Sequence, residues 1–162
     1  MSENLRNEAE ALAASLEIGA VSVADVVAWA HSVIEAEEQP HWSVCELATM
    51  GSSDKPNVVG ALREVPGAID HDWVRGRVVH RLAQGLAEDR TRADRIASAL
   101  YRLAQADELP DRKLQSLAWW ASDALDLADD GLIPETRDEV IDQMLAALTE
   151  AAEAGAPIQR PF

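Results

Sequence analysis

Four histidines are the residues of this chain best suited to acid/base catalysis or metal binding. His31 and Glu35 are four residues apart, so on a helix they would share one face and could form an acid/base pair. Glu38 and His41 have the Glu-x-x-His spacing of di-iron helical bundles, but such sites need a second copy of the motif and two further carboxylates. Pro40 interrupts the motif and no second copy exists. We therefore expect His31 and Glu35 to form an ordinary surface contact, and we expect no metal site.

A second candidate is the run Asp70-His71-Asp72, which stands where a helix is predicted to begin. Aspartates at a helix start accept hydrogen bonds from free backbone N–H groups and favour the positive end of the helix dipole. We therefore interpret these acids as helix caps. The alternative is an enzyme that uses His71 and Asp72, or the His31 and Glu35 pair, in a cleft.

Motifs that would name a reaction are missing from the sequence. There is no Gly-rich phosphate loop, serine nucleophile elbow, Cys-x-x-Cys pair or zinc-helix motif. Cys45 is the only cysteine, which excludes an internal disulfide and a multi-cysteine metal cluster and favours a reducing compartment. We predict that the protein is not an enzyme and that it has no catalytic residues, cofactor or bound metal.

Arginines in the middle of the chain could form a basic ridge for nucleic acid. On predicted helices, Arg77 and Arg81 are one turn apart and three of the later arginines share a side. The acidic ends of the chain would repel phosphate, so we expect these arginines to pair with the acidic faces of neighbouring helices. We predict no direct contact with nucleic acid. The set is Arg75, Arg77, Arg81, Arg92, Arg95 and Arg102.

The sharpest local pattern lies in the helix predicted after Pro110. At 100° per residue, Trp119 projects away from the apolar face and shares its side with Asp123, Asp126 and Asp130. Tryptophan is frequent among binding hot spots, and surrounding carboxylates would select a basic partner. The alternative is that another helix of the same domain covers Trp119.

The predicted partner-binding set takes in two further acids from the last predicted helix, where Asp138 and Asp142 belong to an acidic stripe. The other tryptophans are interpreted as structural. Trp120 lies at the edge of the apolar face, and the remaining three lie on an inner face or near helix starts, where aromatic residues pack the entry turn. These three are Trp29, Trp42 and Trp73.

Apolar residues recur at helical spacing along almost the whole chain, and no run alternates with period two for long enough to form a sheet. We predict an all-α fold, a compact bundle or short stack of about seven antiparallel helices joined by short turns. Glycines at positions 19 and 131 are predicted to end helices. Helices are predicted over about 3–16, 41–50 and 56–65. Longer helices are predicted with Ser22, Asp70 and Thr91 as N-caps and with Pro110 and Pro134 at their first positions.

The 162 residues, 48% of them apolar, suffice for one domain with a real core. We predict a single helical domain over residues 1–154 and a C-terminal tail over 155–162, which is too rich in Pro and Gly to continue a helix. The N-terminus has no basic segment followed by an apolar core, and no stretch approaches about 18 uninterrupted apolar residues. We predict a cytoplasmic protein without a membrane segment.

The net charge of −15 is concentrated at the two ends of the chain. Residues 1–54 have ten acidic side chains against one arginine, and residues 114–162 have ten against two, whereas residues 55–113 have nine against eleven basic ones. A field of this sign repels nucleic acid and anionic membranes and attracts basic partners.

The segment Val26-Val27-Ala28-Trp29-Ala30, followed by Ile34, Pro40 and Glu46-Leu47, occurs here together with the acidic ridge around Trp119. In these residues, which cover about a fifth of the chain, and in its size and acidity, the protein resembles the helical immunity proteins that bacteria make to neutralise a cognate toxin. The resemblance implies tight binding to a basic toxin domain, often a nuclease, whose substrate site is blocked by carboxylates and aromatic anchors.

We therefore predict an acidic protein-binding module that captures and inhibits a basic protein partner, and the resemblance implies an immunity protein. The alternative is a non-catalytic helical adaptor or structural subunit of a larger assembly. The sequence leaves open the identity of the partner and the oligomeric state.

Overall fold

The computed structural model describes residues 4–155, and all the regular secondary structure in this range is helical. It comprises eight α-helices and one 3-10 turn, with no β-strand among the described residues, so the all-α prediction is confirmed. The chain divides into two compact units, with the boundary between Val74 and Arg75. The single domain over 1–154 stays a prediction, because compactness alone does not show whether each unit folds by itself. Of the predicted tail, only Gly155, the end of the last helix, is described.

The first unit contains four helices with a shared core. Helix α1 packs against α4, and α3 contacts both α2 and α4. The core is built from aliphatic side chains of all four helices, with Leu12, Leu16, Val26, Leu47, Val58 and Leu62 among those fully buried. The helices are α1 (Leu5–Glu17), α2 (Val23–Ala36), α3 (Trp42–Leu47) and α4 (Lys55–Arg63).

Local capping interactions set the ends of these helices as the sequence predicts. The Ser22 hydroxyl accepts a hydrogen bond from the Asp25 backbone N–H, while the Asp25 carboxylate accepts one from the Ser22 N–H, which completes a capping box. Gly19 follows α1 with a φ of 80°, in the left-handed region that glycine adopts without a steric penalty. The predicted start of α2 and end of α1 are confirmed.

Gly67 allows the chain leaving α4 to pass close to α1. Its φ is 136°, and a Cβ added there would lie 2.7 Å from the Cβ of Arg6, closer than two carbon atoms can pack. Only glycine satisfies both the backbone angle and the close approach. The segment after α4 can therefore pass this close to Arg6 of α1 only with glycine at position 67.

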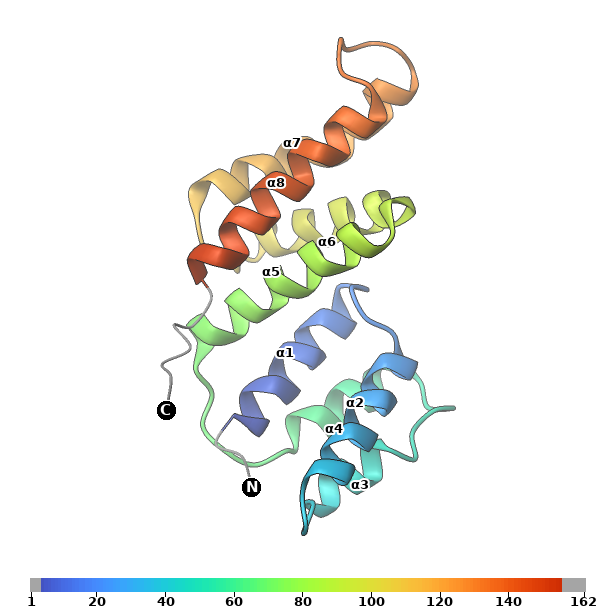
Figure 1. Ribbon diagram of the computed structural model, residues 1–162, viewed down its shortest axis with the longest axis vertical. Coiled ribbons are helices and arrows are strands. Elements are labelled where there is room, and N and C mark those ends of the chain that lie inside the picture. Colours follow the sequence, from blue (N-terminus) through green and yellow to red (C-terminus); the bar gives the residue numbers. More distant parts are fainter. Residues whose placement is uncertain (1–3, 156–162) are drawn as a thin grey trace. The chain divides into compact units, whose positions relative to one another are not determined.

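The second unit contains the remaining helices. In Figure 1, the successive helices α6, α7 and α8 run in alternating directions, and α7 contacts both of its neighbours. This arrangement confirms the antiparallel packing predicted from the short connections. The elements are α5 (His71–Glu88), whose first residues precede the unit boundary, the 3-10 turn η1 (Arg90–Arg92), α6 (Ala93–Gln105), α7 (Arg112–Asp129) and α8 (Arg137–Gly155).

Two predicted caps in this part of the chain have different outcomes. Asp70 accepts a hydrogen bond from the Trp73 N–H at 3.1 Å, which confirms its role at the start of α5. Thr91 is not the cap of α6, and that prediction is wrong. Its N–H and its hydroxyl both donate to the Asp89 carboxylate, at 3.0 and 2.6 Å, because Asp89 caps the 3-10 turn that precedes α6.

Candidate partner-binding surface

Helix α7 presents one face to the interior of its unit. The residues Leu114, Ala118, Ala121 and Leu125 are spaced by four, three and four positions and are all buried. This spacing keeps side chains on one side of a helix, and the alanines let the neighbouring backbones approach. The face is covered by α6 and α8, the two helices that α7 contacts. The packing of the inner face fixes which side chains of α7 point outward.

The opposite side of α7 has the predicted combination of tryptophan and acid. Trp119 is 44% exposed, and Asp123, Asp126 and Asp130 are also exposed. At 3.6 residues per turn these four positions fall within about 60° around the helix axis. The helix therefore groups them as the sequence predicts, although whether a partner binds there stays a prediction.

Two apolar side chains widen this surface. Trp120 and Leu127 are seven positions apart, so they line up along the helix, and both are exposed. Leu132, just past the end of α7, is the most exposed of the large apolar residues among those described. We call the set Trp119, Trp120, Asp123, Asp126, Leu127 and Asp130 the outer face of α7. The sequence analysis did not predict that Leu127 belongs to this surface. The seven-residue spacing from Trp120, which places both residues on the same side of a helix, could have indicated it.

Tyr101 from α6 supports the exposed ring of Trp119. The two rings meet edge to face, with centroids 5.0 Å apart and an interplanar angle of 88°. Edge-to-face pairs of this kind are favourable and orient both rings. The sequence left open whether Trp119 is exposed or covered by another helix of the same domain. In the structure, α6 contacts one edge of the ring through Tyr101 and leaves the rest exposed. Sequence reasoning missed Tyr101, because nothing in the local pattern indicates which α6 residue faces α7.

Two tryptophans differ from the structural role expected of them. Trp120 was interpreted as structural and is 36% exposed, because it lies beside the narrow buried face that Leu114, Ala118, Ala121 and Leu125 form. Trp42 is 61% exposed at the first position of the short helix α3, and the centroid of its ring lies 5.5 Å from that of the neighbouring His41 ring. Trp29 and Trp73 are half-buried, in agreement with a structural role.

The carboxylates of the outer face have no internal counter-ion. Within residues 4–155, no ion pair joins Asp123, Asp126 or Asp130 to a basic side chain. Their neighbour Asp129 differs, because it binds the guanidinium of Arg137 at 2.8 Å. The negative charge of the outer face is thus left to solvent or to a partner.

Arg137 shows how other acids of this unit are neutralised. Besides Asp129 it binds Asp94 on α6, and the hydrogen bond that the guanidinium donates to the Asp94 carboxylate is the largest cause that raises the pKa of Arg137. Partial desolvation acts in the opposite direction. The pair of contacts ties the start of α8 to α6 and to the end of α7.

The two predicted partner-binding acids on α8 are also paired internally. The guanidinium of Arg90 lies 2.9 Å from the Asp142 carboxylate and 3.6 Å from that of Asp138, and it donates a hydrogen bond to the Asp138 carbonyl oxygen. Both carboxylates remain exposed. Their part in partner binding stays a prediction, but they do not belong to the outer face of α7.

Of the central arginines, Arg75 shows the predicted pairing with an acid of another element, whereas Arg92 pairs locally, within the turn that precedes α6. Arg75 binds Glu108 at 2.9 Å, and Arg92 lies 3.6 Å from Asp89. Arg95 and Arg102 are exposed on α6, and no ion pair joins either of them to a carboxylate in the part of the chain that the structure describes.

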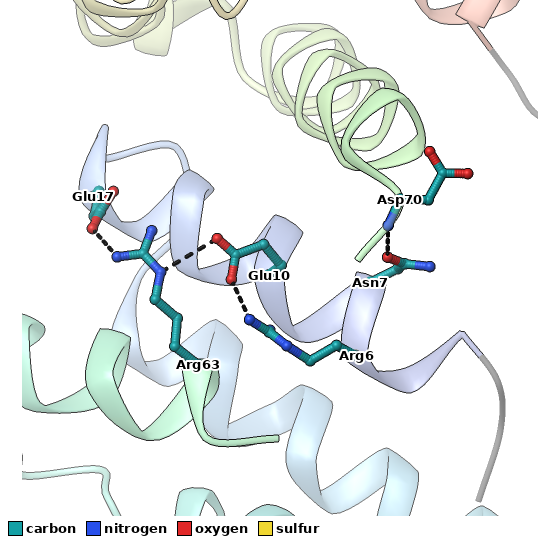
Figure 2. Close-up of polar contacts among 6 residues, drawn as sticks. All are labelled: Arg6, Asn7, Glu10, Glu17, Arg63 and Asp70. Atoms are coloured by element: carbon teal, nitrogen blue, oxygen red, sulfur yellow. Dashed lines mark hydrogen bonds and ion pairs between the residues drawn. The ribbon is translucent and has the colours of Figure 1, made fainter. Parts of the chain in front are cut away.

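Acids on α1 are neutralised in the same way (Figure 2). Arg63 on α4 binds Glu17 at 2.7 Å and Glu10 at 3.3 Å, and Arg6 binds Glu10 at 2.9 Å. The hydrogen bond to Glu17 is the largest cause that raises the pKa of Arg63. Sequence reasoning missed this network, because its partners are far apart along the chain.

The histidine pairs form no site in the structure. His31 and Glu35 are both exposed, and neither has a hydrogen bond or ion pair to the other. The Nδ1 atom of His41 accepts a hydrogen bond from the Ser43 backbone N–H at 3.2 Å, so this ring serves as the N-cap of α3. His71 is exposed in the first turn of α5. Among the described residues, no group of three or more His, Cys, Asp or Glu could hold a metal ion.

None of the described helices combines the length and the apolar character that crossing a membrane requires. Comparisons of the chain with protein-family models, with curated proteins and with solved structures found no match.

Proposed function

We propose that this protein is an acidic binding module that captures a basic protein partner through the outer face of α7. The observation that carries the proposal is the presence, on one helix face, of exposed aromatic side chains and three carboxylates that form no ion pair with a basic residue in the range 4–155. Other acids, on α1, α7 and α8, are paired with arginines. The outer face of α7 thus combines exposed apolar side chains with carboxylates that are available to a basic partner.

Physical chemistry gives each group of residues a role in capture. Trp119 and Trp120 supply large, rigid apolar area, and tryptophan is the residue type most often found in hot spots that dominate binding energy. The carboxylates of Asp123, Asp126 and Asp130 speed encounter with a cationic surface and disfavour acidic competitors. The net charge of −15 extends the same attraction over the whole molecule.

Inhibition follows if the captured surface is the partner's working site. A protein that acts on nucleic acid needs a cationic site, and an anionic helix face competes for that site with phosphate. Together with the resemblance to bacterial immunity proteins, this supports an immunity function against a toxin domain. The natural probe is the protein encoded beside this gene, if its C-terminal domain is basic.

The test compares two matched double variants in capture of that neighbouring protein. Trp119→Ala with Asp126→Lys alters the outer face of α7, and Trp42→Ala with Glu46→Lys makes the same two kinds of change at an exposed tryptophan and an exposed acid on α3. We expect the first variant to weaken capture by about tenfold or more, measured by titration calorimetry, because hot-spot losses are of this size. We expect the second variant to bind as the unaltered protein does.

Equal affinity in all three proteins would place the binding surface elsewhere. Capture that is insensitive to salt, or self-association seen by light scattering without a basic partner, would instead support an adaptor or structural subunit. Capture that protects the neighbouring protein's substrate from cleavage would support the inhibitory role.

A further inference from the structure

We propose that the occupant of the outer face is a basic amphipathic α-helix of the partner, which lies along α7 with its cationic side chains over the aspartates. This inference rests on the proposed function and makes the partner's binding element specific. It is argued from the spacing of the outer face, from its unpaired charge and from the position of that charge on α7.

The outer face repeats the spacing of the inner one. Trp119, Asp123, Asp126 and Asp130 are separated by four, three and four positions, as are the buried residues from Leu114 to Leu125 that pack against α6 and α8. A spacing of this kind forms a straight seam that accepts the ridges of another helix. Helix α7 therefore has two helix-binding seams, and only the inner one is covered by its own unit.

The length of the outer seam fits a helix better than a loop tip. The twelve residues from Trp119 to Asp130 are separated by eleven steps of 1.5 Å, so the seam is about 16 Å long, or three turns. Trp120 and Leu127 flank the seam along one side and are exposed. A helix with one apolar and one cationic stripe can contact both sides of the seam at every turn.

The charge of the seam selects the kind of helix. A partner helix that faces these three carboxylates, which have no ion pair among the described residues, gains from lysine or arginine at matching positions. A second copy of this chain would bring carboxylates against carboxylates, whichever way the two helices ran. An anionic membrane or a nucleic acid would be repelled for the same reason. A basic helix is the occupant that this charge favours.

The position of the acids on α7 adds an independent argument. Asp126 and Asp130 stand near the C-terminal end of the helix, where the dipole disfavours carboxylates, and no basic residue accompanies them in the last turn. They are also spaced as neighbours on the same face, where like charges repel. The acids thus weaken the free protein, as expected of residues that serve binding instead of stability.

The experiment uses the full chain and two synthetic helical peptides of about 18 residues, or five turns. Both contain the same numbers of Lys, Leu and Ala. One places Lys and Leu in adjacent stripes at spacings of three and four, and the other scatters them around the helix. Binding is measured by tryptophan fluorescence and calorimetry, and helix formation by circular dichroism.

We expect the striped peptide to bind at least about tenfold more tightly than the scattered one, as the loss of a hot-spot contact would predict. The preference should disappear in Asp126→Lys and in Asp130→Lys and persist in the Glu46→Lys control. Equal affinity for the two peptides would overturn the inference, because it would show that net charge alone, and not the arrangement of the side chains, accounts for binding. A preference that survives both aspartate variants would overturn it too.

The inference and the proposed function fail in different ways. If the neighbouring protein is captured through Trp119 and Asp126 but the striped peptide shows no preference, the partner does not present a helix and only the inference fails. If the neighbouring protein is not captured through these residues, the proposed function fails, and a striped-peptide preference would then show a helix-binding face with a different partner.

Discussion

At the scale of single residues, the aspartates at the end of α7 are in an unfavourable place. The last turn of a helix has a partial negative charge, and Asp130 occupies the C-cap of α7 with no ion pair to a described residue. Asp129 stands beside it but is neutralised by Arg137. These two adjacent acids therefore differ in whether an arginine from another helix reaches them, which the sequence around them does not show.

Asp130→Lys should make the free protein more stable. A lysine at this position would interact favourably with the helix dipole and remove repulsion with Asp126, so we expect the free energy of unfolding in urea to rise by about 0.3–1 kcal/mol. Asp111 at the opposite end of α7 is the matched control, because its carboxylate accepts a hydrogen bond from the Leu114 N–H at 2.7 Å. Asp111→Ala should lower stability by about 0.5–2 kcal/mol. A loss of stability in Asp130→Lys would mean that this acid has a structural role.

At the scale of elements, helix ends were predictable wherever the deciding interaction is local. The caps at Ser22 and Asp70 and the glycine after α1 depend on residues within three or four positions, and the sequence contains all of them. The prediction for Thr91 was wrong because Asp89, two residues earlier, is a competing capping residue. The Asp89 carboxylate accepts the hydrogen bond of the Thr91 backbone N–H. Local patterns find a helix start but do not rank competing caps.

Two glycines give opposite predictions for the same substitution. Gly67→Ala should lower the free energy of unfolding by more than about 1 kcal/mol, because φ is 136° and the new Cβ would lie 2.7 Å from that of Arg6. Gly60 lies inside α4 with open space around it, so Gly60→Ala should raise stability by about 0.5–1 kcal/mol. Urea denaturation measures both. Similar effects of the two substitutions would contradict the close passage of the chain at Gly67.

At the scale of the whole molecule, the charge of −15 acts on both stability and association. Self-repulsion of like charges disfavours a compact chain and attraction speeds encounter with a basic partner, and salt screens both effects. Charge at this scale is fixed by composition, whereas its distribution over free and paired acids depends on the fold.

Raising the concentration of sodium chloride from about 0.03 to 0.3 M should therefore have two opposite results, since the Debye length falls from about 18 to 6 Å. We expect the midpoint of urea unfolding to increase, and the association rate with the basic partner, followed by stopped-flow fluorescence, to fall by about tenfold or more. Sucrose at matched osmolality serves as a control, because it stabilises compact states without screening charge. An association rate independent of salt would contradict capture by electrostatic attraction.

The sequence by itself determined the all-α class, the main helix boundaries and the grouping of Trp119 with Asp123, Asp126 and Asp130. These follow from periodicity, capping chemistry and the fixed rotation per residue of a helix. Only the tertiary structure decided which acids form ion pairs with arginines and which tryptophans are exposed. Arg63, Arg90 and Arg137 reach carboxylates on other helices, and Tyr101 reaches Trp119 from α6. Such contacts join residues far apart in the chain, so no local pattern contains them.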